Sequence, residues 1–309
     1  MGERDMADSI ISFEGVTKRY GDVLAVDNMS FAVKPGEILG FLGPNGSGKT
    51  TTVRLINGVI YPESGSIRVA GLDTRKDGEA IRARSGVLTE SAQLYESMTV
   101  EENLRFFAEL YNVEQKKVAS RIDGLLEQFR LTDRRAKKVG TLSTGLKKRA
   151  AIAKALIHEP DLLFLDEPTS GLDPEAAREI VEHIKALNGG HATVFVCTHN
   201  LAEAEHFCTR FMFLEKGRIL ESGTLSELEA KYVAEIDLQL DLADSASARL
   251  PEGYEYGGRT AAGVTVKLQG KAAIPAFLRQ ASAMADVFGA RVLNSNLEAL
   301  YFEIRRARQ

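Results

Sequence analysis

A glycine-rich loop, GPNGSGKT, occupies residues 43–50 and ends in a lysine and a threonine. It follows the apolar run EILGFL and precedes a segment of helical character, TTVRLINGV. Glycines let a backbone turn its N–H groups onto phosphate oxygens, a lysine at the end of such a loop reaches the β- and γ-phosphates, and a threonine hydroxyl suits magnesium. The spacing therefore predicts a phosphate-binding loop in which Lys49 contacts phosphate and Thr50 contacts Mg²⁺.

Two acidic residues, Asp166 and Glu167, come directly after the apolar run LLFL. An aspartate at a strand end is suited to hold magnesium, directly or through water. A carboxylate beside the metal and the γ-phosphate can orient and deprotonate an attacking water molecule. We predict these roles for Asp166 and Glu167 respectively; the alternative is a pair of solvated acids at the end of a strand.

A histidine, His199, follows another apolar run, ATVFVC, after one intervening threonine. The carboxyl ends of parallel strands meet at one edge of a sheet, so His199 is expected near the two acids. We predict that it contacts the γ-phosphate and orients the water or Glu167. The alternative is a structural histidine, which is the usual role of a lone histidine at a strand end.

The stretch GTLSTGLKKRA, residues 140–150, opens what reads as an amphipathic helix. A helix start carries unpaired N–H groups and the positive end of the helix dipole, and both favour an anion. No ligand-like residues lie beside it in the sequence, so an anion at this helix must come from elsewhere. The alternative is an ordinary capped helix with Ser143 as its N-cap residue.

The elements that must position these residues follow from the hydrophobic pattern. Apolar runs alternate with helical patterns to about residue 220, which is typical of an α/β domain with a mainly parallel sheet. Thr99 followed by Glu102 predicts a capping box at a helix start. The predicted strands are 37–42, 162–165 and 193–197, and the predicted helices are 104–112 and 114–130.

The pattern changes after about residue 229. Two segments, EIDLQLDL and GVTVKLQ, alternate with a period of two, and AAIPAFLRQASAM and NLEALYFEIRRA look helical. We therefore predict a flexible N-terminus over 1–9, an α/β domain over 10–229 with a helical insert at about 91–157, and a small α+β accessory domain over 230–309. The accessory domain carries no catalytic residues that we recognise; dimerisation, regulation and bracing of a partner are all open.

Composition narrows the class of protein. The net charge of −4 and the pI near 5.9 give no electrostatic reason to expect nucleic acid as a partner. No apolar run approaches the roughly 20 residues of a membrane-spanning helix, and the N-terminal residues MGERDMADSI do not resemble a secretory signal. We expect a cytosolic or peripheral protein, in which Cys197 and Cys208 are reduced and take no part in the chemistry.

Taken together, GPNGSGKT, LSTGL, LLFLDEP, SGLD and the position of His199 occur in the order typical of one family. The first 230 residues or so resemble the ATPase subunit of an ABC transporter. The resemblance implies a P-loop NTPase fold of the ABC type, with a mainly parallel sheet core, an antiparallel β subdomain and a helical insert. It also implies ATP as the ligand, Mg²⁺ as the cofactor and ATP hydrolysis as the activity.

The resemblance also assigns individual residues. Tyr20 would stack on adenine, whereas without the resemblance its pattern favours a core residue. Asp173 would be the D-loop aspartate at a dimer interface. Each signature would grip the ATP bound by a second copy, in a head-to-tail homodimer. The implied ATP-binding residues are Gly43, Asn45, Gly46, Ser47, Gly48, Lys49, Thr50 and Thr51, and the signature is Leu142, Ser143, Thr144, Gly145 and Leu146.

Three positions depart from the family pattern. Thr144 stands where the signature usually has its first glycine, and Leu146 where it usually has glutamine; Gly145, where a phosphate would come closest to the backbone, is retained. Glu90 occupies the Q-loop position, where glutamine is usual and magnesium is contacted. A carboxylate ligates magnesium but adds negative charge near the γ-phosphate. A shifted loop could present Gln93 instead.

The signature variants and the C-terminal NLEALYFEI segment are similar to those of bacterial drug exporters, whose membrane domain is a separate polypeptide. The resemblance therefore implies a motor subunit at the cytoplasmic face of the inner membrane. Its partners would be a separate transmembrane permease and a second ATP-binding domain, with no nucleic acid. Two alternatives are a regulatory ABC protein with little ATP turnover and a soluble ABC protein that acts on ribosomes or DNA.

Overall fold

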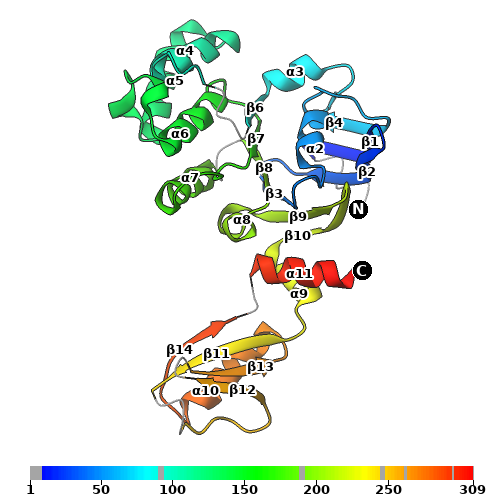
Figure 1. Cartoon of the computed structure of the whole chain (residues 1–309), viewed down its shortest axis with the longest axis vertical. Helices are drawn as coiled ribbons and strands as arrows, with labels where there is room; N and C mark the ends of the chain where they lie inside the picture. The colour runs from blue at the N-terminus through cyan, green and yellow to red at the C-terminus, as the bar shows by residue number, and fades with distance from the viewer. Residues whose placement is uncertain are drawn as a thin grey trace. The chain divides into compact units, whose positions relative to one another are not determined.

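The computed structural model describes residues 9–89, 94–187, 192–243, 248–260, 263–293 and 296–308. The chain forms two compact units, residues 1–222 and 223–309 (Figure 1). The boundary lies before helix α9 (Leu225–Tyr232), which contacts helix α11 (Leu297–Ala307) of the second unit. The boundary expected after residue 229 thus falls inside α9, because the tertiary contacts of that helix are made with residues near the C-terminus.

The first unit contains a six-stranded sheet in the order β10-β9-β3-β8-β7-β6. Pairing is parallel from β9 through β3, β8 and β7 to β6, as the alternation of apolar and helical segments predicted. The carboxyl ends of three strands are adjacent, since Leu42 pairs with Thr198 and Asp166 pairs with Cys197. The strands are β3 (Ile38–Leu42), β6 (Ser85–Leu88), β7 (Leu162–Asp166), β8 (Thr193–Thr198), β9 (Arg210–Glu215) and β10 (Arg218–Gly223).

An antiparallel sheet packs against one face of this parallel sheet, as the family resemblance implied. Its order is β2-β1-β4-β5, with β1 paired antiparallel to both β2 and β4. A cluster of aromatic rings joins the two sheets: Phe31 lies 5.7 Å from Phe41 and Phe41 lies 4.9 Å from Phe195, between ring centroids. The strands are β1 (Ile11–Tyr20), β2 (Val23–Val33), β4 (Ser64–Val69) and β5 (Leu72–Asp73).

Helices form a second core on the opposite face of the parallel sheet, where Ile38, Leu163 and Val194 pack against the helical insert. Figure 1 shows α4, α5 and α6 gathered away from the antiparallel sheet. The predicted capping box of Thr99 and Glu102 is present at the start of α4. The helices on this face are α4 (Val100–Leu110), α5 (Gln115–Gln128), α6 (Thr144–Ala155), α7 (Pro174–Leu187) and α8 (Leu201–Phe207), with 3₁₀ turns at Thr132–Arg134 and Val139–Thr141. Helices α2 (Lys49–Ile56) and α3 (Gly78–Ala83) instead bury residues in the core shared with the antiparallel sheet.

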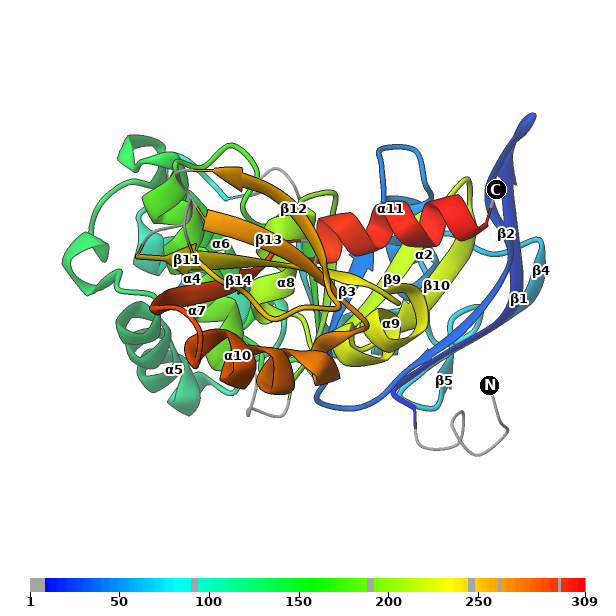
Figure 2. The ribbon, with the colours of Figure 1, turned by 90° about the horizontal axis from the view of Figure 1, so that it is seen from below.

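The second unit is an α+β fold with an antiparallel sheet in the order β12-β13-β11-β14. Phe277 and Ala281 of helix α10 (Ile274–Ser282) are buried with the apolar residues of one sheet face, along which α10 runs (Figure 2). The sequence predicted β11 (Ile236–Leu242) and β13 (Gly263–Leu268) but missed β12 (Glu255–Thr260) and β14 (Val287–Val292). These two are edge strands and largely exposed, so they lack the regular apolar alternation that identifies a buried strand.

Removing one ring from the aromatic cluster should destabilise the first unit. Phe195 is fully buried and lies within 5.6 Å of Phe164 as well as 4.9 Å of Phe41. We expect Phe195→Ala to lower the free energy of unfolding by about 3–5 kcal/mol, because it leaves a cavity between the two sheets. Denaturant unfolding of the full chain measures this. The control Val59→Ala, at a side chain that is 58% exposed, should change the value by less than about 0.5 kcal/mol; equal losses would contradict the assignment.

Candidate functional site

The glycine-rich loop connects β3 to α2, and its close packing explains its composition. Residues 43–48 form the loop, and Lys49, Thr50 and Thr51 begin α2. Gly48 has a φ of +105°, and a Cβ at this residue would lie 2.4 Å from the carbonyl oxygen of Ala25 on β2. Only glycine fits there. The Ser47 hydroxyl is buried and has no hydrogen-bond partner among the described residues.

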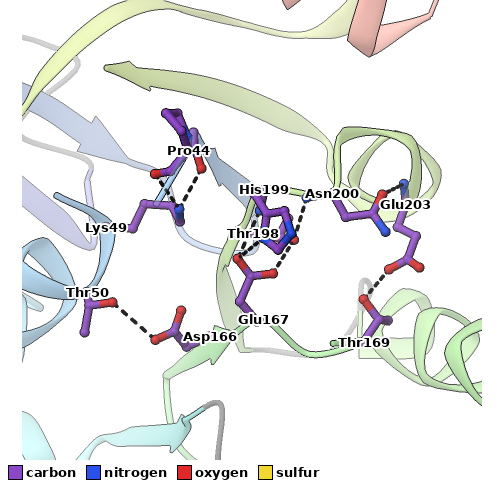
Figure 3. A network of polar contacts seen from close by, with 11 residues as sticks. Pro44, Lys49, Thr50, Asp166, Glu167, Thr169, Thr198, His199, Asn200 and Glu203 are labelled. Carbon is purple, nitrogen blue, oxygen red and sulfur yellow. Dashed lines mark hydrogen bonds and ion pairs between the residues drawn. The ribbon is translucent and has the colours of Figure 1, made fainter. Parts of the chain in front are cut away.

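The ammonium group of Lys49 lies inside this loop. Its Nζ donates to the carbonyl oxygens of Gly43 at 2.6 Å and Pro44 at 3.1 Å (Figure 3), and the residue is buried. A cation is therefore enclosed by a turn of small residues at the start of a helix, where backbone N–H groups and the helix dipole also favour negative charge. This donor set fits a phosphate group, as the sequence predicted.

Two oxygen ligands meet beside the loop. Thr50 Oγ1 donates to Asp166 Oδ2 at 3.4 Å, which brings the start of α2 and the end of β7 together. Hydroxyl and carboxylate oxygens are suitable ligands for Mg²⁺, which usually also keeps water and phosphate oxygens. In the ranges that the structure describes, no group of three or more His, Cys, Asp or Glu side chains is arranged to hold a metal ion. The pair thus fits a metal that is completed by phosphate and water.

Glu167 has an unusual backbone conformation. Its φ is +47°, a region that non-glycine residues seldom occupy and that is maintained only by surrounding contacts. The backbone N–H of Glu167 donates to the carbonyl oxygen of Cys197 at 2.8 Å, which extends the contact between β7 and β8 by one residue. The left-handed turn redirects the chain where β7 ends, next to the carboxyl end of β8.

The carboxylate of Glu167 accepts three hydrogen bonds from β8 and the residue after it (Figure 3). Thr198 Oγ1 donates to Oε2 at 2.9 Å, and the backbone N–H and ring Nδ1 of His199 lie 3.1 and 2.7 Å from Oε1. The Glu167 side chain is only 13% exposed, whereas that of His199 is 58% exposed. The alternative of a solvated acid is therefore wrong for Glu167. The ring of His199 contacts the Glu167 carboxylate on one side and is exposed to solvent on the other.

Thr198 is a site residue that the sequence analysis missed. Besides donating to Glu167, its hydroxyl oxygen accepts from the backbone N–H of Asn200 at 3.0 Å. Asn200 caps α8 by accepting from Glu203 N, and the Glu203 carboxylate accepts from Thr169 Oγ1. A hydroxyl residue between a buried strand and a candidate histidine was the available signal. The network ties His199 to the start of α8 and to the segment after Glu167.

Tyr20, predicted to stack on adenine, lies at the end of β1 and is 45% exposed. The Lys18 ammonium lies 5.6 Å from its ring centroid. The alternative that Tyr20 is a core residue is wrong, since nearly half of the side chain meets solvent. Strand β1 pairs with β2, and Ala25 of β2 packs against Gly48 of the glycine-rich loop. Tyr20 therefore belongs to the same antiparallel sheet that contacts the loop. Contact with adenine stays a prediction.

The LSTGL segment forms the start of α6, as expected. Ser143 is the N-cap residue, and its hydroxyl accepts from Leu146 N at 3.4 Å; Ser143 and Thr144 are exposed. Gly145 is buried, and a Cβ there would lie 2.9 Å from the Cβ of Ala176 on α7. Gly145 therefore has a packing role that the sequence did not reveal. Phosphate binding at this residue stays a prediction.

The segment 142–146 makes no described hydrogen bond or ion pair with the glycine-rich loop or with the two acids. Asp173, predicted at a dimer interface, is exposed, and its Oδ1 accepts from Glu175 N and Ala176 N at the start of α7. Glu90 and Gln93, the two candidates for the Q-loop position, lie outside the described residues. Within one chain, the helix start of α6 is thus a separate exposed surface.

The remaining expectations concern cysteines and membranes. Burial raises the pKa of the Cys197 thiol well above its ordinary value, with the Asp166 charge adding to the effect, and burial also raises the pKa of Cys208. Both thiols are therefore poor nucleophiles. Among the helices that the structure describes, none has the length and apolar character needed to cross a membrane.

Comparisons with known proteins show which family the chain is similar to. A family model described as ABC transporter matches residues 26–170. The chain is 40% identical to the daunorubicin resistance ATP-binding protein DrrA3 of Streptomyces coeruleorubidus, over 73% of this chain and 72% of that protein. It is 37% identical to the Nod factor export ATP-binding protein I of Paraburkholderia xenovorans (strain LB400), over 82% and 86%. A solved dimeric ATP-binding cassette in a post-hydrolysis state with ADP and Pi matches with a TM-score of 0.62 and 27% identity, over 69% of this chain and 98% of that one.

The packing role of Gly145 predicts opposite effects for two glycine-to-alanine changes in helices. Gly145→Ala should lower the free energy of unfolding by about 1–3 kcal/mol, because its methyl group meets Ala176. Gly124→Ala, in α5 with nothing near its Cβ, should raise the value by about 0.5–1 kcal/mol. Denaturant unfolding of both variants tests the pair; a stabilising Gly145→Ala would show that α7 does not contact α6 as described.

Proposed function

The chain belongs to the ABC transporter family, and we propose from this premise that it is the ATP-hydrolysing motor subunit of an exporter. One observation carries the catalytic part of the proposal: the carboxylate of Glu167 is held by Thr198 and His199 at the edge of the sheet where the phosphate loop begins. Relatives named for daunorubicin resistance and Nod factor export support an export role. ATP closes a dimer, closure moves the membrane subunit, and hydrolysis reopens the dimer.

The nucleotide lies along the phosphate loop in this proposal. Lys49 contacts the β- and γ-phosphates, Thr50 and Asp166 hold Mg²⁺, and Tyr20 stacks on adenine. The enclosed Lys49 ammonium and the unpartnered Ser47 hydroxyl support this placement. Glu90 is a third proposed metal ligand on sequence grounds. When bound, Mg²⁺ neutralises charge on the phosphate oxygens and so favours attack by water. The other loop residues that contact phosphate are Gly43, Asn45, Gly46, Gly48 and Thr51.

Glu167 acts as the general base. Three hydrogen bonds fix its carboxylate, so the oxygen that accepts a proton from the attacking water keeps one position through the reaction. Because a carboxylate only accepts hydrogen bonds, the Nδ1 nearest to it carries a proton. In a neutral His199 ring, Nε2 is then an acceptor directed away from Glu167. His199 thereby orients Glu167 on one side and meets the γ-phosphate region on its exposed side.

The signature segment completes the site of a second copy. The exposed helix start at Ser143 and Thr144 has no anion of its own within the described chain. A twofold-related copy brings one, because a head-to-tail pair places each helix start at the other copy's phosphate loop. The matching dimeric cassette with ADP and Pi supports pairing of this kind. Exposed Asp173 lies at the same interface in this proposal.

The helical insert provides the docking surface for a separate transmembrane permease at the cytoplasmic face of the inner membrane. Tyr95, Phe106 and Phe107 form a cluster of rings with centroids 5.1 to 6.1 Å apart. Leu110 lies on α4, the helix that carries Phe106 and Phe107, and is 61% exposed. Asn103 fixes Tyr95 in place, since it exchanges hydrogen bonds of 2.8 and 3.0 Å with the Tyr95 backbone. A rigid, partly exposed aromatic surface is typical of a protein interface.

Replacing the proposed base should separate ATP binding from hydrolysis. We expect Glu167→Gln to lower the steady-state ATPase rate by at least about 100-fold, because an amide accepts protons poorly, while ATP binding is retained. The assay uses the chain reconstituted with its membrane subunit. A wild-type chain that binds ATP but turns over no faster than the variant would contradict the motor proposal and favour the regulatory alternative.

Thr198 provides a matched pair of variants for its positioning role. Thr198→Val removes the hydroxyl that donates to Glu167 and should lower kcat by about 10-fold with little change in KM, since the carboxylate loses one of its three donors. Thr198→Ser keeps the hydroxyl and should retain most of the rate. Equal rates for the two variants would show that the hydroxyl does not position Glu167.

The docking surface predicts a variant that hydrolyses ATP but does not reach its partner. Leu110→Glu places a charge on the exposed aromatic surface and should reduce recovery of the chain with membranes by about 10-fold or more, without changing ATP binding. Val59→Glu, at a similarly exposed side chain that follows α2 and lies outside the helical insert, is the control. Equal recovery of both variants would place the permease on another surface.

A further inference from the structure

Strand β14 is an open edge of the sheet in the second unit. Among the described residues it pairs only with β11, and Figure 1 shows it at one side of that sheet. Large apolar side chains accompany the edge: Phe288 is 74% exposed, and Met284 and Leu293 just outside the strand are 48% and 43% exposed. An exposed edge with apolar residues is a template for pairing with another strand.

The hydrogen-bond pattern of β14 determines which residues offer backbone groups to a new strand. Leu293 N donates to Asp237 O at 2.8 Å, and Arg291 and Gly289 follow in the same register opposite Gln239 and Asp241. Inward and outward bonding alternate along an antiparallel strand. Residues 289, 291 and 293 therefore bond to β11, and Ala290 and Val292 direct their N–H and C=O groups outward. The register shifts between Gly289 and Val287, so Phe288 is the extra residue of a bulge and has no partner residue on β11.

We propose that β14 pairs antiparallel with β14 of a second copy of this chain, about a twofold axis at Ala290. The outward-bonding Ala290 residues then face one another, and Val292 lies opposite the bulge residue Phe288 of the second copy. Registers that place an outward-bonding residue opposite an inward-bonding one cannot form the ladder. The pairing joins the two sheets into one continuous sheet, and a self-complementary contact of this kind is what twofold symmetry requires.

Charge and shape favour this register over its neighbours. It places Arg291 of the second copy opposite Gly289, which has no side chain and borders a hollow lined by Asp241, Gln239 and Arg291. The Asp241 carboxylate has no described partner and lies across from Gly289, where the incoming guanidinium would meet it. Sliding by one ladder step in one direction sets Arg291 against Arg291, and in the other direction it moves Arg291 opposite Val287, away from Asp241.

The contact is small, since about five residues of each copy pair, and isolated two-stranded contacts are weak. It needs no nucleotide and no signature contact, so it is independent of the ATP-dependent dimer proposed above. When both copies are attached to one transporter, their high effective concentration makes even a weak contact form. The second unit would thus keep the two ATP-binding units together after hydrolysis has opened the ATP-dependent interface.

The oligomeric state of the full chain without nucleotide tests the proposal. Sedimentation equilibrium should detect a reversible dimer, with a dissociation constant on the order of 10–100 μM for a contact of this size. Ala290→Pro removes an outward N–H without breaking a bond to β11, and should abolish the dimer while thermal unfolding stays that of wild type. A wild-type chain that stays monomeric up to several times that concentration would overturn the proposal.

Charge variants test the register, and they are informative even if Ala290→Pro fails to fold. Asp241→Arg should weaken the dimer by at least about fivefold, since both symmetric pairs become repulsive, and combining it with Arg291→Asp should restore affinity. Glu252→Arg, an exposed acid before β12 at the other edge of the sheet, is the control and should leave affinity unchanged. Equal affinity for Asp241→Arg and wild type would overturn the proposed register.

A combined variant separates this contact from the ATP-dependent dimer. Glu167→Gln with Ala290→Pro should be monomeric without nucleotide and dimeric with ATP and Mg²⁺, because only the β14 contact is lost. If wild type dimerises without nucleotide and Ala290→Pro dimerises equally well, the contact lies elsewhere and the proposal is wrong, whatever the ATP-dependent dimer does.

Discussion

Parallel pairing of β3, β8 and β7 is the constraint on which the site depends. Each strand delivers a different chemical group where it ends: the phosphate loop after β3, the acids at the end of β7, and Thr198 with His199 at β8. Their register places these ends side by side, with Leu42 opposite Thr198 and Asp166 opposite Cys197. A shift of one residue would turn the strands' apolar side chains from one core to the other, so two packed cores hold the register that the chemistry needs.

The packed cores also maintain local conformations that are unfavourable by themselves. Glu167 adopts a positive φ, and Lys49 keeps an ammonium group in a mostly enclosed loop. Such features persist only when surrounding contacts determine them. The aromatic cluster between the two sheets and the backbone bond from Glu167 to Cys197 supply those contacts. In the proposed function, the unfavourable conformation of Glu167 fixes the carboxylate that acts as the base.

Three exposed surfaces of the chain are suited to contacts with other molecules. Among the described residues, the helix start at Ser143 and Thr144 is exposed and meets no anion, the aromatic surface around Tyr95 is partly exposed, and β14 leaves one edge unpaired. In our proposals they differ in what completes them: a nucleotide held by a second copy, a membrane partner, and a matching strand. Contacts of different strength and nucleotide dependence allow one interface to open during the cycle while others stay closed.

The sequence by itself determined the parts of this protein that depend on neighbouring residues. The glycine-rich loop, the position of the acidic pair and the histidine at one sheet edge, the capping box of α4 and the parallel α/β core all followed from residue types at short, regular spacing. Tertiary structure decided the rest. The hydroxyl of Thr198 reaches Glu167 across 31 positions, Gly145 needs its small size because of Ala176 on another helix, and Tyr20 proved to be exposed. Local spacing determines which bonds a segment can make with itself, whereas contacts between distant segments depend on how whole elements pack, and no short pattern records that packing.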